Sequence, residues 1–483
     1  MFSPLQRLTQ HADERPDDPA LIAAEGTMTF AELDRAVSAV AARLRALGVA
    51  PRQVVATDLA PADDWIVTLA LLRIATRTVS LTAVGSVPGF VPDAVLARPG
   101  SDAVEAPLVQ TVDRLWIEQV VAEHDENAET ARASTVLYPR SDSICRLILT
   151  SGTTGTPRPA ELTVGAVEHR LANLHHYWTD HRRELNLMTL STTGGFHTAL
   201  ACLMHGTPYL TVDPGGDRHF ARAASARVQV LTGSPVQVGH AMVVLRERGI
   251  ELQGLEEVRT AGAAASPTLL GEIARTLAVP VRGVYGSTEG GGVCTRMLHR
   301  GGEPDDVGEP VPGIRLEIVD ETGQPVPAGE TGDVRYRGPA LASGYSGADP
   351  DRRFRDGWFH PGDRGRLTAE GHLVLAGRTS ELVNVGGVKI DPASVDRAIE
   401  GFPGLKDGGS FLIERLPGVP ELGLAVVADA SCDLRALDRL LRQRLPGKHP
   451  TVFGHVSVIP RNRMGKVERG RLTEEFRRRL ELE

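Results

Sequence analysis

The sequence predicts an α/β protein with two domains: a large N-terminal domain of parallel-rich sheets with helices plus a β-rich subdomain, and a small α+β C-terminal domain. Three observations favour this class. A length of 483 residues exceeds what one hydrophobic core usually serves. Helical and strand patterns alternate from the N-terminus onward. After Gly308 the pattern changes to short alternating strands rich in Pro and Gly.

The N-terminal third supports the parallel sheet element by element. Thr29 is positioned to cap a helix, because Glu32 follows three residues later, and Gly48 ends the helical pattern. A strand follows at residues 54–59. The apolar stretch at residues 65–81 then indicates a buried helix that leads into a strand. Repeated β/α units of this kind favour parallel strands covered by helices.

The middle third continues the alternation, with short apolar strands at residues 228–231 and 281–285. The β-rich part after Gly308 is expected to be partly antiparallel. Together these segments extend the large domain to residue 378.

The remaining segment has the composition of a small domain. It contains strand patterns, a helix at residues 392–400 and a second helix that ends near Leu445. Its length is sufficient for a core of its own. We therefore expect a large domain at residues 1–378 and a small domain at residues 379–483.

Composition excludes several classes of function. Hydrophobic residues make up 41% and charged residues 24% of the chain, which fits a soluble globular protein. The formal charge of −8 disfavours a nucleic-acid partner. The four cysteines are dispersed, which predicts neither a disulfide framework nor a zinc site. We find no signal-peptide pattern and no membrane span, since Arg73 and Arg77 interrupt the most apolar stretch. A soluble, cytoplasmic protein without a membrane partner is expected.

Lysine is rare in this chain. Of the 53 basic residues only four are lysine, and they are Lys389, Lys406, Lys448 and Lys466. A coding bias toward arginine explains most of this preference. A retained lysine is nevertheless a candidate for a role that needs a compact ammonium group, which arginine cannot readily supply.

A loop rich in glycine and hydroxyl groups follows the apolar run at residues 147–150. Its N–H groups and hydroxyls can surround phosphate oxygens, and Arg158 adds a positive charge. An ordinary turn is the alternative, and a P-loop NTPase is disfavoured because the Walker GK[ST] is missing. The loop residues are Ser151, Gly152, Thr153, Thr154, Gly155 and Thr156.

Three further segments carry groups suited to a nucleotide. In YGSTE, Tyr285 can stack on a base, while Thr288 and Glu289 offer hard oxygen ligands for Mg²⁺. In GWFHPGD, Asp363 follows a glycine turn and can accept both ribose hydroxyls, although a turn cap is equally compatible. The segment PRNRMGK presents Lys466, which by itself would be taken for a solvated charge.

In order and identity these segments resemble motifs of the adenylate-forming superfamily, which comprises acyl-CoA synthetases, adenylation domains of peptide synthetases and luciferases. The phosphate loop of that family is similar to LTSGTTGTPR, its adenine and magnesium motif to YGSTE, and its ribose motif to GWFHPGD. Its hinge and acceptor motif is similar to GRTSELVNVGGVKI, and its catalytic-lysine motif to PRNRMGK. The likeness spans nearly the whole chain, because TFAELDRAVSAVAARLRALGV also resembles the first helix of the family.

The resemblance implies a two-step reaction. A carboxylate attacks the α-phosphorus of ATP and releases pyrophosphate, and a thiol or an amine then attacks the acyl-AMP. It implies catalytic roles for Lys466, for Glu289 as the Mg²⁺ ligand, and for Thr288 on the α-phosphate. Nucleotide-binding roles fall on the phosphate loop with Arg158 and on Ala263, Ala264, Ala265, Tyr285, Gly286, Asp363 and Arg378.

The resemblance also assigns the acid and its acceptor to particular residues. The resemblance implies that the small C-terminal domain is mobile and rotates about Ser380, which brings in either Lys466 or the acceptor loop. Substrate and acceptor roles fall on His197, Gly262, Gly290, Gly387 and Lys389.

The chain departs from the family pattern at several positions. Arg158 and Pro159 stand where the phosphate loop usually ends in Lys-Gly, and Ser380 replaces the usual Asp or Lys of the hinge. His197 either gates the acyl tunnel or is an ordinary histidine. No aspartate lies beside Phe196, which disfavours an α-amino acid. The glycines at residues 290–292 leave room for an aryl or medium-chain acid.

The preferred activity is that of an acyl- or aryl-CoA synthetase, with CoA as the acceptor. An adenylation enzyme that loads the phosphopantetheine of a carrier protein, or an amine, is the close alternative. A nucleotide-binding relative without catalysis is the alternative from another class. The joint presence of Lys466, Glu289 and Asp363 argues against it.

Overall fold

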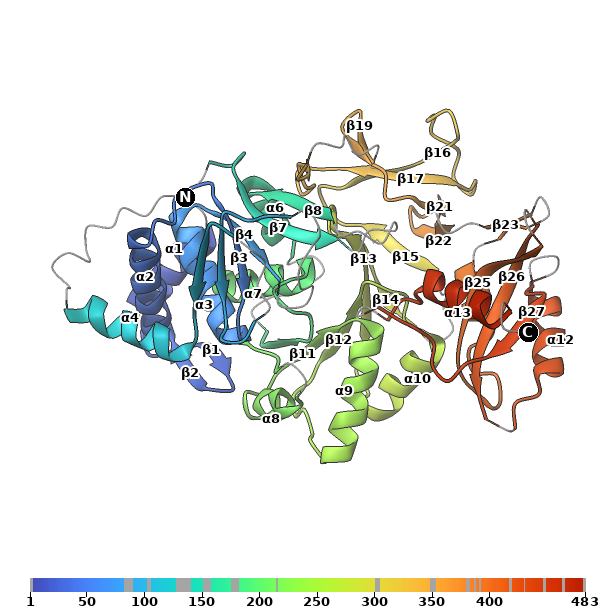
Figure 1. Ribbon diagram of the computed structural model, residues 1–483, viewed down its shortest axis with the longest axis horizontal. Helices are drawn as coiled ribbons and strands as arrows, with labels where there is room; N and C mark the ends of the chain where they lie inside the picture. Colours follow the sequence, from blue (N-terminus) through green and yellow to red (C-terminus); the bar gives the residue numbers. More distant parts are fainter. Residues whose placement is uncertain are drawn as a thin grey trace.

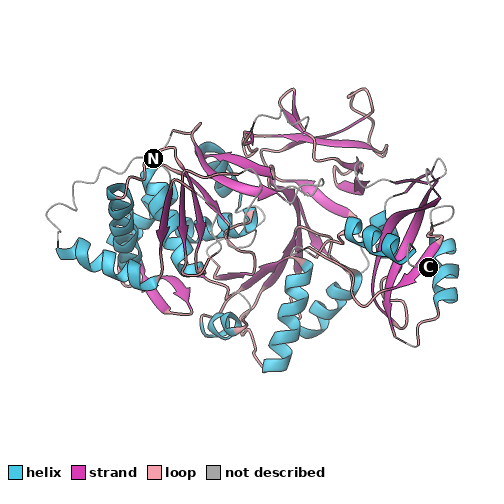
Figure 2. Ribbon diagram, in the orientation of Figure 1, coloured by secondary structure: helices cyan, strands magenta, loops and turns pink. Residues whose placement is uncertain are grey.

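The computed structural model describes most of the chain, and the statements below concern that part. The described residues are 3–81, 90–101, 106–126, 140–150, 158–174, 182–213, 216–299, 305–347, 353–378, 383–385, 388–390, 392–416, 419–429, 431–445, 449–462 and 465–480. The arrangement is the expected α/β class, with several sheets and helices packed on their outer faces (Figures 1 and 2).

The first sheet has the strand order β18-β8-β7-β4-β3-β5-β6. The pairings among β7, β4, β3, β5 and β6 are parallel, whereas β8 pairs antiparallel with both β7 and β18. The predicted parallel alternation of the N-terminal third is therefore confirmed. The strands are β3 (Val54–Asp58), β4 (Arg77–Ser80), β5 (Ala94–Ala97), β6 (Leu108–Thr111), β7 (Ile144–Thr150), β8 (Arg158–Thr163) and β18 (Gly344–Tyr345).

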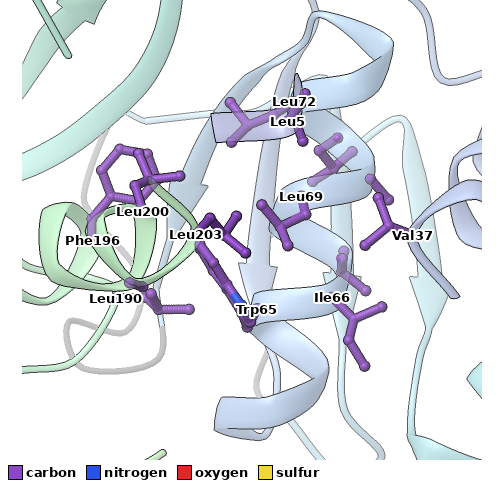
Figure 3. Packing of buried hydrophobic residues seen from close by; sticks show 14 of the residues in the cluster. Leu5, Val37, Trp65, Ile66, Leu69, Leu72, Leu190, Phe196, Leu200 and Leu203 are labelled. Carbon is purple, nitrogen blue, oxygen red and sulfur yellow. The ribbon is translucent and has the colours of Figure 1, made fainter. Parts of the chain in front are cut away.

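Helices from the N-terminal half cover this sheet and enclose its core. Thr29 and Glu32 form the predicted capping box at the start of α2. Trp65 is fully buried, and Figure 3 shows its indole pointing toward Leu190 and Leu203. No described helix is long and apolar enough to cross a membrane. The helices are α1 (Ser3–Glu14), α2 (Phe30–Ala46), α3 (Pro61–Ile74), α4 (Arg114–Glu126), α6 (Val164–Leu174) and α7 (Thr193–His205).

A small three-stranded sheet lies beside this layer. Its order is β10-β1-β2, and the strands are β1 (Pro19–Ala23), β2 (Gly26–Thr29) and β10 (Tyr209–Leu210).

The second large sheet changes character at one strand. β9 (Glu184–Asn186), β11 (Val230–Gly233), β12 (Glu257–Ala261) and β13 (Val281–Ser287) run parallel, and their helices are α8 (Arg218–Ser225), α9 (Pro235–Arg248) and α10 (Pro267–Thr276). From β13 onward every pairing is antiparallel, so the antiparallel character predicted after Gly308 is confirmed, while the change itself lies earlier, at the pair of β13 and β14. These strands are β14 (Gly291–Leu298), β15 (Asp306–Pro310), β16 (Arg315–Val319), β17 (Gly332–Arg337), β19 (Phe354–Arg355), β20 (Trp358–Phe359), β21 (Asp363–Leu367) and β22 (Leu373–Arg378).

The C-terminal segment has two hydrophobic clusters made only of residues from Ile390 onward. It forms a separate orange-to-red lobe in Figure 1. The helix α13 packs on β25, because Leu472 and Phe476 enter the same cluster as Phe411. The elements are β23 (Val383–Val385), β24 (Val388–Ile390), α11 (Pro392–Ala398), β25 (Leu405–Leu416), β26 (Val419–Ala428), α12 (Leu434–Arg444), β27 (Val452–His455) and α13 (Arg469–Leu480).

Candidate active site

The predicted adenine and ribose residues lie together at the end of β13. Tyr285 donates a hydrogen bond from its phenol to Oδ2 of Asp363 at 2.5 Å, although 78 positions separate the two residues in sequence. Asp363 is buried and begins β21, where it pairs with Arg378 at the end of β22. Burial, followed by the negative charge of Asp363, raises the pKa of Tyr285 well above its ordinary value. The phenol therefore stays protonated and remains a donor.

The segment at residues 262–264 follows the neighbouring strand β12 and is exposed. Gly262 has a φ of +86°, a conformation that glycine adopts without strain. Because β12 and β13 are parallel, their carboxyl ends lie at the same edge of the sheet. Ala263 and Ala264 thus present open backbone beside Tyr285, as a nucleotide-binding segment requires. Ser266 then caps α10 by accepting a hydrogen bond from Leu269.

Glu289 is a buried carboxylate with partners on one of its oxygens. The Tyr345 phenol donates to Oε1, and the Arg353 guanidinium lies 3.5 Å from the same oxygen. Glu289 is only 4% exposed. Since both contacts fall on Oε1, Oε2 is the oxygen that can face a cation. A carboxylate oxygen of this kind is a suitable ligand for Mg²⁺.

Gly290 and Gly291 have packing neighbours that explain the absence of a side chain. A Cβ at Gly290 would lie 2.7 Å from Cε2 of Tyr336, and one at Gly291 would lie 3.1 Å from Nε of Arg170. Tyr336 is fully buried, and its hydroxyl hydrogen-bonds Ser287 Oγ at 3.0 Å. We predicted that these two glycines leave room for a bulky acid. The structure instead fills the space beside them with Tyr336 and Arg170, so their lack of a side chain is explained by packing.

His197 lies on α7, where the Thr192 side chain caps the helix. It is 4% exposed, and its Nδ1 lies 2.7 Å from the carbonyl oxygen of Thr193. Burial, together with the charge of Arg170, lowers the pKa of His197 to about 3. The ring is therefore neutral, Nδ1–H donates to Thr193, and Nε2 is left without a partner among the described residues. The buried position agrees with an ordinary core histidine, and a gating role stays a prediction.

Arg158 begins β8 directly after the predicted phosphate loop. Its carbonyl accepts a hydrogen bond from Thr150 Oγ1 at 3.1 Å, and its guanidinium lies 5.9 Å from the centre of the Tyr345 ring. Arg158 is thus on the same side of β8 as the tyrosine that holds Glu289. The loop itself lies outside the described residues, as do Gly387 and Ser380. Lys389 is described only through its backbone in β24.

Lys466 is exposed and belongs to a tight turn in the C-terminal segment. Its N–H donates to Oδ1 of Asn462, and Gly465 adopts a φ of +81°. Arg461 braces the turn by donating to the Gly465 carbonyl at 2.8 Å. A Cβ at Gly465 would meet Cγ2 of Val236 at 2.2 Å, so the turn contacts the start of α9.

This contact places the lysine turn at the edge of the sheet that carries the other candidate residues. The helix α9 starts directly after the carboxyl end of β11. Because β11, β12 and β13 are parallel, their carboxyl ends share one edge. The turn of Lys466 therefore packs at the edge where Tyr285 and Glu289 lie.

Sequence reasoning missed Tyr336, Tyr345, Arg353 and Arg170. Their contacts with the YGSTE segment join positions far apart in the chain, so no local pattern marks them. The sequence offered one indirect signal, which is the small number of tyrosines. The chain has only six, and three of them contact the residues of this site.

Comparison with known proteins identifies a family and a shared fold. The AMP-binding enzyme family matches the chain over residues 8–346. A fatty acid–[acyl-carrier-protein] ligase of Mycobacterium marinum is 28% identical over 96% of both chains. A feruloyl-CoA synthase of Amycolatopsis is 29% identical over 93% of this chain and 94% of that protein. The structure of o-succinylbenzoate coenzyme A synthetase from Bacillus subtilis, in complex with ATP and magnesium ion, superposes with a TM-score of 0.80 at 22% identity, covering 96% of this chain and 98% of that chain.

Proposed function

The chain belongs to the AMP-binding enzyme family and is an adenylate-forming ligase, and on this premise we propose that it joins a carboxylic acid to the thiol of CoA. The observation that carries the proposal is the grouping at one sheet edge. Tyr285, Asp363 and Glu289 lie there, and the turn of Lys466 packs on the same edge. These are the groups that acyl-AMP formation needs.

We assign nucleotide binding to the end of β13 and its surroundings. Asp363 accepts the ribose hydroxyls, with Arg378 beside it in the strand pairing, and Tyr285 holds the Asp363 carboxylate in place. The exposed backbone at residues 262–264 lines the adenine and the acyl group. Arg158 and the loop that precedes it take the β- and γ-phosphates.

In the first half-reaction, a carboxylate oxygen of the acid attacks the α-phosphorus of ATP. The bond between that phosphorus and the bridging oxygen of pyrophosphate breaks, so acyl-AMP forms and pyrophosphate leaves. Negative charge grows on the α-phosphate oxygens, and preorganised cations stabilise it best. We assign this role to the Lys466 ammonium and the Thr288 hydroxyl. Glu289 would hold Mg²⁺, which would supply positive charge to the phosphates.

In the second half-reaction, a thiol attacks the acyl carbon and AMP leaves. We propose that residues 1–378 and 379–483 act as two domains, and that rotation about Ser380 replaces the Lys466 turn with the loop of Gly387 and Lys389. The separate clusters of the C-terminal segment support its movement as one body. One contact that such a rotation would break is the ion pair of Arg397 with Asp305 at 3.6 Å.

CoA and the phosphopantetheine of a carrier protein offer the same thiol chemistry. One relative is named for a carrier-protein substrate and another for CoA, with similar identity and coverage. We take CoA as the acceptor and an aryl or medium-chain acid as the substrate, because the two relatives are named for a fatty acid and for a feruloyl group. The cytoplasm is the proposed compartment, since the four cysteines are free thiols and three of them are buried.

The test is ATP–pyrophosphate exchange across a panel of aryl and aliphatic acids. Exchange with at least one acid is expected, and its absence with all of them would refute the adenylation reaction. Lys466→Ala should lower exchange by orders of magnitude while thioester formation from supplied acyl-AMP changes little. Equal losses in both half-reactions would contradict the role of Lys466. Parallel reactions with CoA and with a phosphopantetheinylated carrier protein then separate the two acceptors.

A further inference from the structure

Arg170 is a buried arginine on α6 that sequence motifs do not mark. It is only 2% exposed. Burying a guanidinium is costly unless its N–H groups find acceptors. Here Nε donates to the Ala340 carbonyl at 2.8 Å, and Nη2 donates to the carbonyls of Glu289 at 2.8 Å and Thr288 at 3.2 Å. One side chain therefore binds three backbone carbonyls from two distant segments.

Those carbonyls belong to the segments that supply and hold the candidate Mg²⁺ ligand. Thr288 and Glu289 end the YGSTE motif. Ala340 precedes β18, which carries Tyr345, the donor to the Glu289 carboxylate. The Ala342 N–H also donates to the Glu289 carbonyl, at 2.7 Å. Arg170 thus fixes both the backbone of Glu289 and the strand that orients its side chain.

The same helix is connected to the described residues that flank the predicted phosphate loop. The helix α6 follows β8 without a gap, and β8 begins at Arg158, where the loop ends. Thr150, at the start of the loop, pairs with Arg158 in the β7–β8 register, and β18 pairs with β8 through Tyr345 and Ala160. A displacement of α6 would therefore change the position of Thr288 and Glu289 relative to the ends of that loop.

The surroundings are built for an arginine at this position. Gly291 adopts a φ of +71°, and a Cβ there would lie 3.1 Å from Arg170 Nε. The planar guanidinium presents several donors in fixed directions, which lets it bind carbonyls that face different ways. A lysine ammonium is a point charge on a flexible stem and cannot reproduce this geometry.

We propose that Arg170 is a positioning residue for the adenylation step, which acts by holding Thr288 and Glu289 in register with Thr150 and Arg158, the described residues that flank the phosphate loop. This inference rests on the proposed function. It predicts that loss of Arg170 impairs acyl-AMP formation and the use of Mg²⁺, and leaves attack on preformed acyl-AMP almost intact. A displacement of about 1 Å in such groups can cost about 100-fold in rate.

The experiment compares Arg170→Met and Arg170→Lys with a matched control on the same helix. Asn173 lies one turn further on and donates to the Pro312 carbonyl at 2.9 Å rather than to a residue of the YGSTE segment. The readouts are kcat, KM for ATP and the Mg²⁺ dependence of pyrophosphate exchange, together with thioester formation from supplied acyl-AMP. Circular dichroism and thermal unfolding establish that each variant is folded.

We expect about a 100-fold lower kcat of exchange and a raised Mg²⁺ requirement for Arg170→Met. We also expect no rescue by Arg170→Lys and near wild-type values for Asn173→Ala. If the Met variant does not fold, Arg170→Lys provides the same comparison, because it keeps the charge. A folded Arg170 variant with wild-type kcat and Mg²⁺ dependence overturns the proposal, and so does an equal loss in both half-reactions. A wild-type enzyme that exchanges with no acid refutes the proposed function itself.

Discussion

Gly290→Ala distinguishes two explanations for the glycines that follow YGSTE. A glycine there either leaves room for a bulky acid or lets a neighbouring side chain approach. The structure favours the second, because a Cβ at Gly290 would lie 2.7 Å from Cε2 and 2.8 Å from Oη of Tyr336. Tyr336 is fully buried and packs at 5.4 Å on Phe359, so it has little space into which it can move. A single methyl group is therefore expected to displace Tyr336.

The expected cost follows from overpacking of a filled core, which is typically about 1–3 kcal/mol. Displacing Tyr336 also strains its hydrogen bond to Ser287, whose Oγ accepts from the Gly290 N–H at 3.0 Å. The turn that presents Glu289 is therefore altered together with the core. We expect activity to fall for small and bulky acids alike, since the damage lies in the turn.

The assay combines denaturant unfolding with pyrophosphate exchange on a graded series of small to bulky acids. Gly239→Ala is the matched control, because its Cβ would lie 3.9 Å from Leu269, an ordinary contact, and alanine favours a helix. That variant should keep its activity and be unchanged or slightly more stable. Unaltered stability of Gly290→Ala, with activity lost only for bulky acids, would refute the packing explanation and restore the pocket explanation.

Three further predictions concern single side chains. Tyr345→Phe removes the hydrogen-bond donor to the buried Glu289 carboxylate, so the free energy of unfolding without nucleotide should fall by about 1.5–3 kcal/mol. Pyrophosphate exchange should also need a higher Mg²⁺ concentration. If both quantities stay at their wild-type values, Tyr345 does not support Glu289. Burial lowers the pKa of His197 from its ordinary 6.5 to about 3 in the folded chain. As pH falls below 6.5, the unfolded chain therefore binds a proton at His197 that the folded chain does not, and the folded state loses about 2 kcal/mol of stability by pH 5. His197→Phe should flatten that part of the stability curve between pH 7 and pH 5, and an unchanged slope would contradict the buried neutral ring. Asp363→Asn should raise KM for ATP about tenfold or more by weakening the ribose contact, and less so for 2′-deoxy-ATP, which lacks one hydroxyl; equal effects on both nucleotides would count against ribose binding by Asp363.

Features determined by neighbouring residues could be predicted from the sequence. The capping box of Thr29 and Glu32 is one example, because both of its hydrogen bonds close within one helical turn. The predicted antiparallel character after Gly308 is another, since turn residues and period-two patterns are local signals. Within the candidate site, Tyr285, Glu289 and Asp363 were found because each lies in a short contiguous motif.

Contacts between distant segments could not be predicted in this way. Arg170 and Tyr345 are separated in sequence from Glu289 by more than a hundred and by more than fifty positions, respectively. Their proximity depends on the pairing of β8 with β18 and on the packing of α6 against the second sheet. Neither this strand pairing nor this helix packing can be deduced from a single sequence. The residues that hold the motif were therefore missed, whereas the motif itself was recognised.

The role of an individual glycine is the feature that local sequence patterns predict least well. A glycine in the sequence says that a side chain is absent, but it does not say what occupies the space. At Gly262 the φ of +86° and the exposed position are compatible with a ligand beside an open backbone. At Gly290 the space is filled by Tyr336, and at Gly291 it is filled by Arg170. The same residue type, close to the same sheet edge, thus lies at an exposed position in one case and against a packed side chain in the other, and only the three-dimensional arrangement separates the two.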